Sequence, residues 1–380
     1  MQKRIFLSPP WVGEPERAAM SAAFDSGYVA PCGPMVDAFD RRLGELAGTQ
    51  AAAVASGTAA LDLLMEELKV GPETIVIAST LTFIATVGPA CHRGAQPIFV
   101  DSDPLTGTIS IPLLEQALRA VARKQKAAGR KKRQILVLAA DIYGQCCDYD
   151  ALEELCNTYQ VTLVVDAAEA VGATCRNRAA GQAGCAAVYS FNGNKIMTTS
   201  GGGAVLSRNP EIVARARWRA QQARENAVWY EHREVGYNYR LSNLLASVGC
   251  AQLDRLPEII RRKRKIFDFY QGLLCGDKRP GHQITPYPCG DFTQSTRWLS
   301  VFIFPSEAAR DAASARLTAA NIESRPVWKP LHLQPVFKKC RVYGSAVAED
   351  LFRRGLCLPS GAGLTRGQLT RIADALVGVS

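Results

Sequence analysis

A lysine, an aspartate and a Ser-Gly-Thr turn each follow an apolar run that is typical of a buried strand. Lys195 comes shortly after residues 186–189, and Asp166 follows the run that covers residues 161–165. The turn at residues 56–58 follows a run of small residues and leads into a helical pattern. Because the carboxyl ends of parallel strands meet at one edge of an open sheet, where such folds bind ligands, we expect these stretches to lie together.

The three stretches offer complementary groups to one ligand. A lysine side chain is costly to bury unless its amino group is paired with an opposite charge, is neutral or forms a covalent bond. Alone, Lys195 is better interpreted as a surface residue on a turn, but its upstream neighbours favour a chemical role. Ser56, Gly57 and Thr58, at the start of a helix, present backbone N–H groups and hydroxyls to an anion such as phosphate.

Lysine, aspartate and phosphate cradle together match the requirements of pyridoxal 5′-phosphate. The lysine would form a Schiff base, Asp166 would keep the pyridine nitrogen protonated as an electron sink, and the helix N-terminus would hold the phosphate. Three glycines, Gly201 to Gly203, follow Lys195 and would permit close backbone approaches that a side chain would forbid.

The elements around these residues alternate between strand and helix patterns. Strands are expected at residues 51–55, 74–78, 97–100, 135–140, 161–165, 186–189 and 203–206, and helices at 11–27, 35–46, 59–68, 111–122, 149–159 and 210–224. Such repeated units predict a mostly parallel sheet covered by helices on both faces. No G-x-G-x-x-G opens a helix and no P-loop motif occurs, which disfavours a dinucleotide site and a P-loop.

The remaining third of the chain predicts a second structural unit. A helix from residue 242 is expected to break or kink at Pro257 and to resume to about residue 274. Strands are expected at 298–304 and 323–326, and helices at 306–320 and 366–377. We therefore predict a large cofactor-binding domain at residues 1–256 and a small C-terminal domain at residues 257–380.

Composition excludes several other classes of protein. The net charge of +10 is concentrated at residues 123–133 and 261–265, and neither stretch carries the interleaved aromatics that stack on bases, so we predict no nucleic-acid partner. No signal-like segment and no run of about 20 apolar residues occurs, which favours a cytoplasmic protein with no membrane partner. Twelve cysteines without a C-x-x-C pair and only four histidines predict reduced thiols and no metal site.

Three segments carry a family resemblance over nearly the whole chain. They are SFNGNKIMTTSGGG at residues 190–203, VGYNYRLSN at 235–243 and WKPLHLQPVF at 328–337. With them the chain resembles the DegT/DnrJ/EryC1/StrS sugar aminotransferases, which are fold-type I pyridoxal-phosphate enzymes. Within the family it looks most like bacterial UDP-4-keto-6-deoxy-N-acetylglucosamine 4-aminotransferases of the bacillosamine branch, which also share Ser200 before the three glycines.

The resemblance implies a fold and a set of roles. The fold would be α/β, a large domain with a mostly parallel seven-stranded sheet and a smaller C-terminal α+β domain. Further cofactor contacts would be Phe83 over the ring, Glu169 near the 3′-hydroxyl and Ser190 on the phosphate. Residues near the substrate would be Tyr28, Asn194, Lys329 and His332.

The resemblance also implies a homodimer with shared active sites. Residues 225–240 form a polar and aromatic stretch without a clear period, and long loops of this kind are often functional. In the family this loop crosses to the partner subunit, where Asn238 would contact the partner's cofactor phosphate; Asn243 is the second candidate.

The expected reaction is transamination at C4 of a UDP-linked 4-keto-6-deoxy-N-acetylhexosamine with L-glutamate as donor. Lys195 would carry the cofactor and move the proton. Alternatives are another nucleotide-linked keto-sugar, or a non-catalytic nucleotide-sugar-binding protein with a relic site. Sugar 3-dehydratases of the family carry histidine in place of this lysine, which speaks against that activity.

Overall fold

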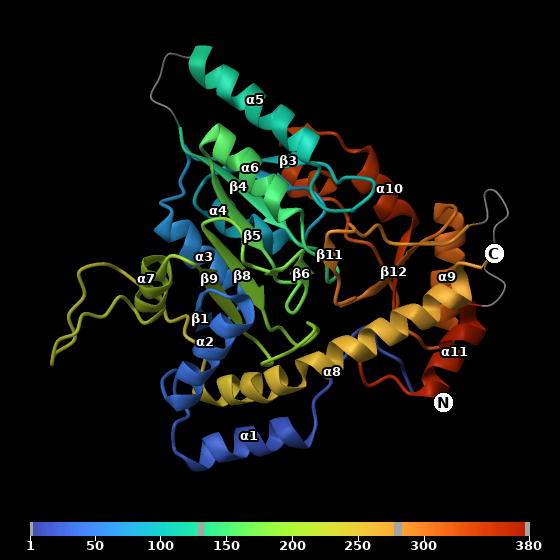
Figure 1. The fold of residues 1–380 in the computed structure, drawn as a ribbon, viewed down its shortest axis with the longest axis horizontal. Helices are drawn as coiled ribbons and strands as arrows, with labels where there is room; N and C mark the ends of the chain where they lie inside the picture. The colour runs from blue at the N-terminus through green and yellow to red at the C-terminus, as the bar shows by residue number, and fades with distance from the viewer. Residues whose placement is uncertain (1–2, 128–132, 277–282, 377–380) are drawn as a thin grey trace.

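The computed structural model describes residues 3–127, 133–276 and 283–376 (Figure 1). Its centre is an eight-stranded sheet in the order β1-β9-β8-β5-β4-β2-β3-β14. In that order the strands are Gln50–Val54, Gly203–Ser207, Ala186–Ser190, Thr162–Asp166, Ile135–Ala140, Ile75–Ser79, Gln96–Val100 and Val342–Tyr343. Only β9 runs antiparallel to its neighbours, so the described sheet is mostly parallel, as predicted.

Helices cover both faces of this sheet because its strands are apolar on both sides. All residues of β4, β8 and β9 are buried. One face packs against helices α2 (Pro34–Ala47), α5 (Ile111–Ala127), α6 (Tyr149–Tyr159) and α8 (Asn243–Leu274). The other packs against α3 (Gly57–Glu67), α4 (Gly88–His92) and α7 (Pro210–Ala220).

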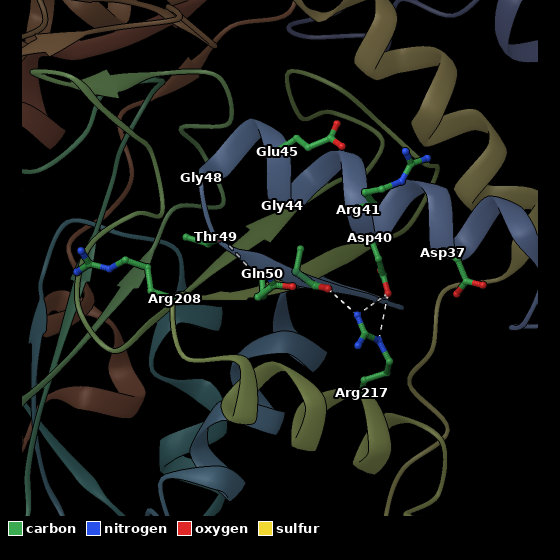
Figure 2. Close-up of a pocket in the computed structure, with 11 residues that line it drawn as sticks. Asp37, Asp40, Arg41, Gly44, Glu45, Gly48, Thr49, Gln50, Arg208 and Arg217 are labelled. Atoms are coloured by element: carbon green, nitrogen blue, oxygen red, sulfur yellow. Dashed lines mark hydrogen bonds and ion pairs between the residues drawn. The ribbon is translucent and has the colours of Figure 1, made fainter.

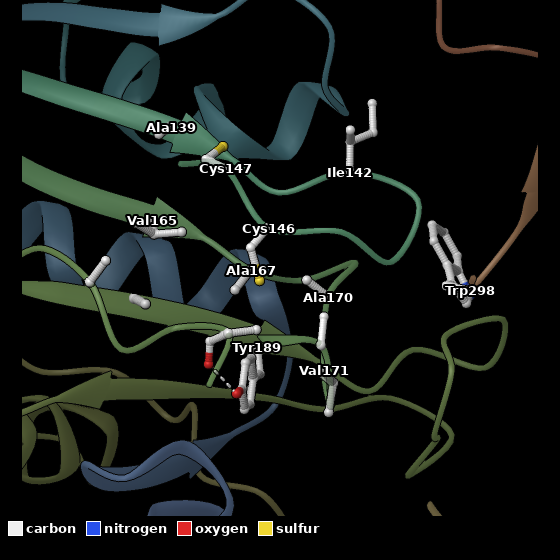
Figure 3. Packing of buried hydrophobic residues seen from close by; sticks show 14 of the residues in the cluster. Ala139, Ile142, Cys146, Cys147, Val165, Ala167, Ala170, Val171, Tyr189 and Trp298 are labelled. Atoms are coloured by element: carbon white, nitrogen blue, oxygen red, sulfur yellow. Dashed lines mark hydrogen bonds between the residues drawn. The ribbon is translucent and has the colours of Figure 1, made fainter. Parts of the chain in front are cut away.

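The core on the first face continues to the carboxyl ends of the strands. Figure 3 shows Ala139, Val165 and Tyr189 from neighbouring strands packed beside the loops that follow them. Cys146 and Cys147 lie in the same layer as free thiols, and burial raises the pKa of both. The sheet edge formed by the carboxyl ends of the strands, where the ligand was expected, therefore rests on closely packed side chains.

An ion-pair clamp fixes the β1 edge of the sheet (Figure 2). Asp40 of α2 accepts hydrogen bonds from the Ala53 N–H of β1 at 2.6 Å and from Arg217 of α7 at 3.0 Å. Arg217 also donates to the Ala51 carbonyl at 2.8 Å. The shallow cavity beside this clamp is lined mostly by charged side chains and holds none of the predicted site residues.

The C-terminal third builds a separate four-stranded sheet, β10-β12-β15-β13. Its strands are Thr285–Pro286, Ser300–Ile303, Gly355–Leu358 and Arg325–Pro326, and helices α9 (Glu307–Ala319), α10 (Ala346–Arg354) and α11 (Arg366–Leu376) accompany it. Short strands β11 (Thr293–Gln294), β6 (Thr174–Cys175) and β7 (Arg178–Ala179) form a third sheet. β14 carries this part of the chain back to the central sheet, which adds an eighth strand to the seven that were predicted.

Several predicted boundaries shift. The helix expected at residues 11–27 is α1 (Glu14–Asp25), and the one expected at 210–224 ends at Ala220. Gln222 and Ala223 have φ of 59° and 53°, a left-handed conformation that cannot continue a helix. Residues 128–132 of the predicted basic stretch and Val377 of the last predicted helix lie outside the described residues.

The helix break expected at Pro257 is absent, because the proline lies inside the 32-residue helix α8. One end of α8 packs on α1 and α2 and the other on the C-terminal sheet, and these contacts override the missing N–H of proline (Figure 1). The predicted domain boundary at residues 256 and 257 falls inside this helix and stays a prediction. Among the described residues, no helix has both the length and the hydropathy to cross a membrane.

Lys263 of α8 should make stability depend on pH. Its Nζ is buried and donates to the carbonyls of Trp298 and Ser360, and burial lowers its pKa from 10.5 to about 7. Between those values the unfolded chain binds more protons than the folded one, so this group favours folding increasingly as pH rises. From about pH 7 to pH 10, wild type should gain roughly 2–4 kcal/mol of unfolding free energy over Lys263→Met. Urea unfolding across that range measures the difference, and parallel pH profiles for the two proteins would contradict it.

Candidate active site

A cavity of about 300 Å³ lies where β5 and β8 end and α3 begins. It gathers most of the cofactor contacts expected from the sequence: Ser56, Gly57, Thr58, Phe83, Asp166, Glu169, Ser190 and Lys195. The strands place them there because their carboxyl ends share one edge of the sheet.

Lys195 lies between an acid and an indole ring. Its Nζ is 3.6 Å from Oε1 of Glu169 and 4.4 Å from the centroid of the Trp298 ring, and its side chain is 13% exposed. Glu169 also accepts the Tyr143 N–H at 3.1 Å. Burial raises the pKa of Glu169, although the lysine charge opposes that shift. The amino group is thus held at the cavity wall, within reach of a bound ligand.

Asp166, the last residue of β5, is oriented by two donors. Its Oδ2 accepts from the Thr86 hydroxyl at 2.6 Å, and its Oδ1 accepts from the Ala168 N–H at 3.1 Å. Burial raises its pKa, and among the described residues it makes no ion pair. A protonated pyridine nitrogen would supply the positive charge that this buried carboxylate lacks.

Close backbone contacts shape the start of α3 into a cradle. Ser56 caps the helix by accepting the Ala59 N–H at 3.0 Å, while the N–H groups of Gly57 and Thr58, at the very start of the helix, have no intrahelical partner. A Cβ added to Gly57 would lie 3.1 Å from the Ser190 Cβ, and one added to Gly203 would lie 2.4 Å from the Gly57 nitrogen. The space beside these glycines and Ser190 fits a phosphate, so the residues present suit pyridoxal 5′-phosphate.

A second cavity of about 760 Å³ adjoins the first. Asn194 and Trp298 line it next to Lys195, and Lys329 and Trp328 line it from the C-terminal part. Phe83, half exposed on the rim of the first cavity, lies 5.5 Å from the Trp328 ring. Two of the predicted substrate contacts, Asn194 and Lys329, therefore line a space next to the one that contains the lysine.

Four predicted residues line neither cavity: Tyr28, Asn238, Asn243 and His332. Tyr28 is exposed, and its carbonyl accepts from Asn243. Asn238 lines a separate hollow beside residues 220–227, so a cofactor contact would need a partner subunit. The His332 side chain is 7% exposed, with Nδ1 2.6 Å from the Thr80 hydroxyl and Nε2 3.1 Å from Glu349. Both of its ring nitrogens have partners within the chain, and its expected contact with substrate stays a prediction.

Three residues at this site were not predicted from the sequence: Asp141, Thr86 and Trp298. Asp141 directly follows β4, as Asp166 ends β5, and it lines the cavity; burial raises its pKa to about 7. An acid directly after an apolar strand pattern was visible in the sequence as a signal. Thr86 and Trp298 carried no such signal, because each acts through a residue far away in the chain. Within the described residues, no cluster of three or more acids, histidines and cysteines could hold a metal.

Comparison with known proteins decides the family. The family model for DegT/DnrJ/EryC1/StrS aminotransferases matches residues 11–377. The chain belongs to this family. It is 41% identical to EpsN of Bacillus subtilis (strain 168), over 99% of this chain and 96% of EpsN. It is 31% identical to the GDP-perosamine synthase of Caulobacter vibrioides, over 98% and 97% of the two chains.

The fold has a counterpart that contains the cofactor. The PLP form of Spr1654 from Streptococcus pneumoniae superposes with a TM-score of 0.87 at 25% identity, covering 99% of this chain and 98% of that one. This protein is therefore a pyridoxal-phosphate-dependent sugar aminotransferase that acts on nucleotide-linked keto-sugars. The cofactor, when bound, supplies an electron sink conjugated to the reacting carbon.

Asp166→Asn should impair catalysis without loosening the fold. The amide cannot balance a pyridinium charge, so we expect kcat to fall about 10²- to 10³-fold. The Tm of the cofactor-free variant should equal or exceed that of cofactor-free wild type, because a buried, unpaired carboxylate is removed. Thr86→Val, which keeps the Asp166 carboxylate but removes the hydrogen bond to Oδ2 and the one shared with the Thr82 hydroxyl, is the matched control and should cost about tenfold or less. An Asp166→Asn enzyme with wild-type turnover would contradict the assignment.

Proposed function

We propose that this enzyme transfers the amino group of L-glutamate to C4 of a UDP-linked 4-keto-6-deoxy-N-acetylhexosamine. The product would be UDP-4-amino-4,6-dideoxy-N-acetylglucosamine, used in bacterial glycan biosynthesis of the bacillosamine type, and the reaction would take place in the cytoplasm. Support comes from the three sequence segments at residues 190–203, 235–243 and 328–337. The observation that carries the proposal is the large second cavity lined by Asn194, the residue before Lys195, and by Trp298, whose ring lies against the Lys195 amino group.

Lys195 and its neighbours would perform the proton transfer. The lysine, once released from the cofactor, lies beside Glu169 and can carry a proton between the donor's α-carbon and the cofactor. Asn194 and Lys329 would border the sugar nucleotide, since both line the second cavity. The Lys329 ammonium suits a diphosphate.

We further propose a homodimer with shared sites. The loop between α7 and α8 exposes four large apolar side chains, Val228, Trp229, Tyr230 and Val235, and Val228 is 98% exposed. Apolar groups gathered on one loop are typical of a surface that a partner covers. A second chain placed there could bring Asn238, and with it Tyr28, to its neighbour's cavity. An active monomer in size-exclusion chromatography would contradict this part of the proposal.

The test separates the two half-reactions. L-Glutamate should convert the bound cofactor to pyridoxamine phosphate, seen as loss of the visible absorption band. The amino form should then be reoxidised by the UDP-linked keto-sugar at a kcat/KM at least tenfold above that for a GDP-linked 4-keto-6-deoxyhexose. The GDP-linked sugar is the natural competitor, because one relative is a GDP-perosamine synthase. Faster reaction with the GDP-linked sugar would overturn the UDP assignment and leave the aminotransferase assignment intact.

A further inference from the structure

Trp298 is buried directly against the amino group of Lys195. The indole ring is 1% exposed, and Nζ of Lys195 lies 4.4 Å from its centroid. Glu169 Oε1 lies 3.6 Å from the same nitrogen. A cation over the face of an indole is attracted by the ring's negative face, most strongly where water is excluded. The ring and the carboxylate therefore form two walls of one binding place for an ammonium.

The polar edge of the same indole holds the backbone beside the lysine. Trp298 Nε1–H donates to the carbonyl of Asn194 at 2.8 Å, and the Ser8 hydroxyl donates to the same oxygen at 3.1 Å. One side chain thus restrains both the main chain just before Lys195 and the far end of its side chain. Trp298 lies 104 positions after Asn194 in the chain and outside the cofactor-binding sheet, so this restraint comes from a distant segment.

Trp298 is itself firmly placed. Its carbonyl accepts from the buried Lys263 of α8 at 3.0 Å. Its nitrogen would lie 2.6 Å from a Cβ added to Gly144, so the loop after β4 packs onto it. In Figure 3 its ring projects toward the loops that follow β4 and β5. A side chain fixed on several sides can impose its geometry on a flexible lysine.

We propose that Trp298 is the positioning residue for Lys195. Its face receives the ε-ammonium whenever the lysine is not bonded to the cofactor, and its N–H fixes the adjoining peptide. The lysine is thereby kept near Glu169 during a half-reaction instead of sampling its many rotamers. This inference rests on the proposed role of Lys195, but its central claim concerns the cofactor-free protein.

The experiment measures the acetylation rate of Lys195 in cofactor-free protein with acetic anhydride and peptide mass spectrometry, with exposed Lys69 as internal reference. The aromatic face stabilises the unreactive ammonium, so Trp298→Leu should speed acetylation about two- to tenfold. Trp298→Phe keeps an aromatic face but loses the N–H donor to Asn194, so its acetylation rate should lie between those of wild type and Trp298→Leu. Trp11→Leu is the matched control, because its indole lies under Arg255 and Arg262, with their guanidinium carbons 4.0 and 4.4 Å from the ring centroid. Trp11→Leu should leave the acetylation rate of Lys195 unchanged.

A second measurement covers the case in which Trp298→Leu fails to fold. Wild-type protein grown with fluorinated tryptophans keeps the indole shape and N–H while the ring face loses negative charge. Lys195 acetylation should then rise stepwise with the number of fluorines. A rate independent of fluorination, or equal in wild type and folded Trp298→Leu, would overturn the proposal. Neither assay uses a donor or a sugar, so its failure is distinct from failure of the proposed reaction.

Discussion

Replacing Lys195 with alanine is expected to abolish transamination, with kcat reduced by at least about 10⁴-fold. Lys195 is the lysine that lines the cavity with Asp166 and the phosphate cradle. Without its amine, neither covalent attachment of the cofactor nor proton transfer beside Glu169 is available. The measurement is the visible absorption spectrum with added pyridoxal 5′-phosphate, followed by the rate of 2-oxoglutarate formation from L-glutamate.

Lys195→Arg separates loss of charge from loss of the nucleophile. Its guanidinium keeps a positive charge near Glu169 but stays protonated and cannot attack an aldehyde. We expect it to be as inactive as Lys195→Ala while remaining more stable, because Glu169 is not left as an unpaired buried acid. Turnover within tenfold of wild type in either variant would show that another group does the chemistry.

The second large effect is expected from adding a single methyl group at Gly203. An alanine Cβ there would lie 2.4 Å from the nitrogen of Gly57 and 2.4 Å from the carbonyl carbon of Ser56. Both are backbone atoms of the phosphate cradle, so the start of α3 must move. We expect affinity for pyridoxal 5′-phosphate to fall at least about 100-fold, with a stability loss of about 1–3 kcal/mol. Absorption titration of cofactor-free protein gives the affinity.

Gly201→Ala is the matched control in the same glycine run. Its added Cβ would meet only the Ala55 carbonyl at 3.7 Å, an ordinary contact. Cofactor affinity should therefore remain within about threefold of wild type. Equal losses in the two variants would mean that the run needs flexibility in general and that close approach at Gly203 is not the reason for its glycine.

The sequence alone determined the architecture and the centre of the site. Continuous apolar runs such as 135–140 and 186–189 predicted strands buried on both faces, and the structure has them as β4 and β8. Because such strands end at a shared edge, the sequence predicted that Lys195, Asp166 and the Ser56 turn lie close together. Local chemistry and a simple topological rule sufficed for these residues.

Only the tertiary structure decided which distant side chains complete the site. Trp298 and Thr86 sit in ordinary apolar surroundings in the sequence, yet one touches Nζ of Lys195 and the other orients Asp166. His332 bonds Thr80 and Glu349, partners that the sequence did not predict, and its expected contact with substrate stays a prediction. α8 passes through Pro257 because packing along its whole length outweighs one lost hydrogen bond. Such outcomes depend mostly on contacts between segments that are far apart in the chain, such as Thr86 with Asp166 and His332 with Thr80, and local patterns carry no information about those contacts.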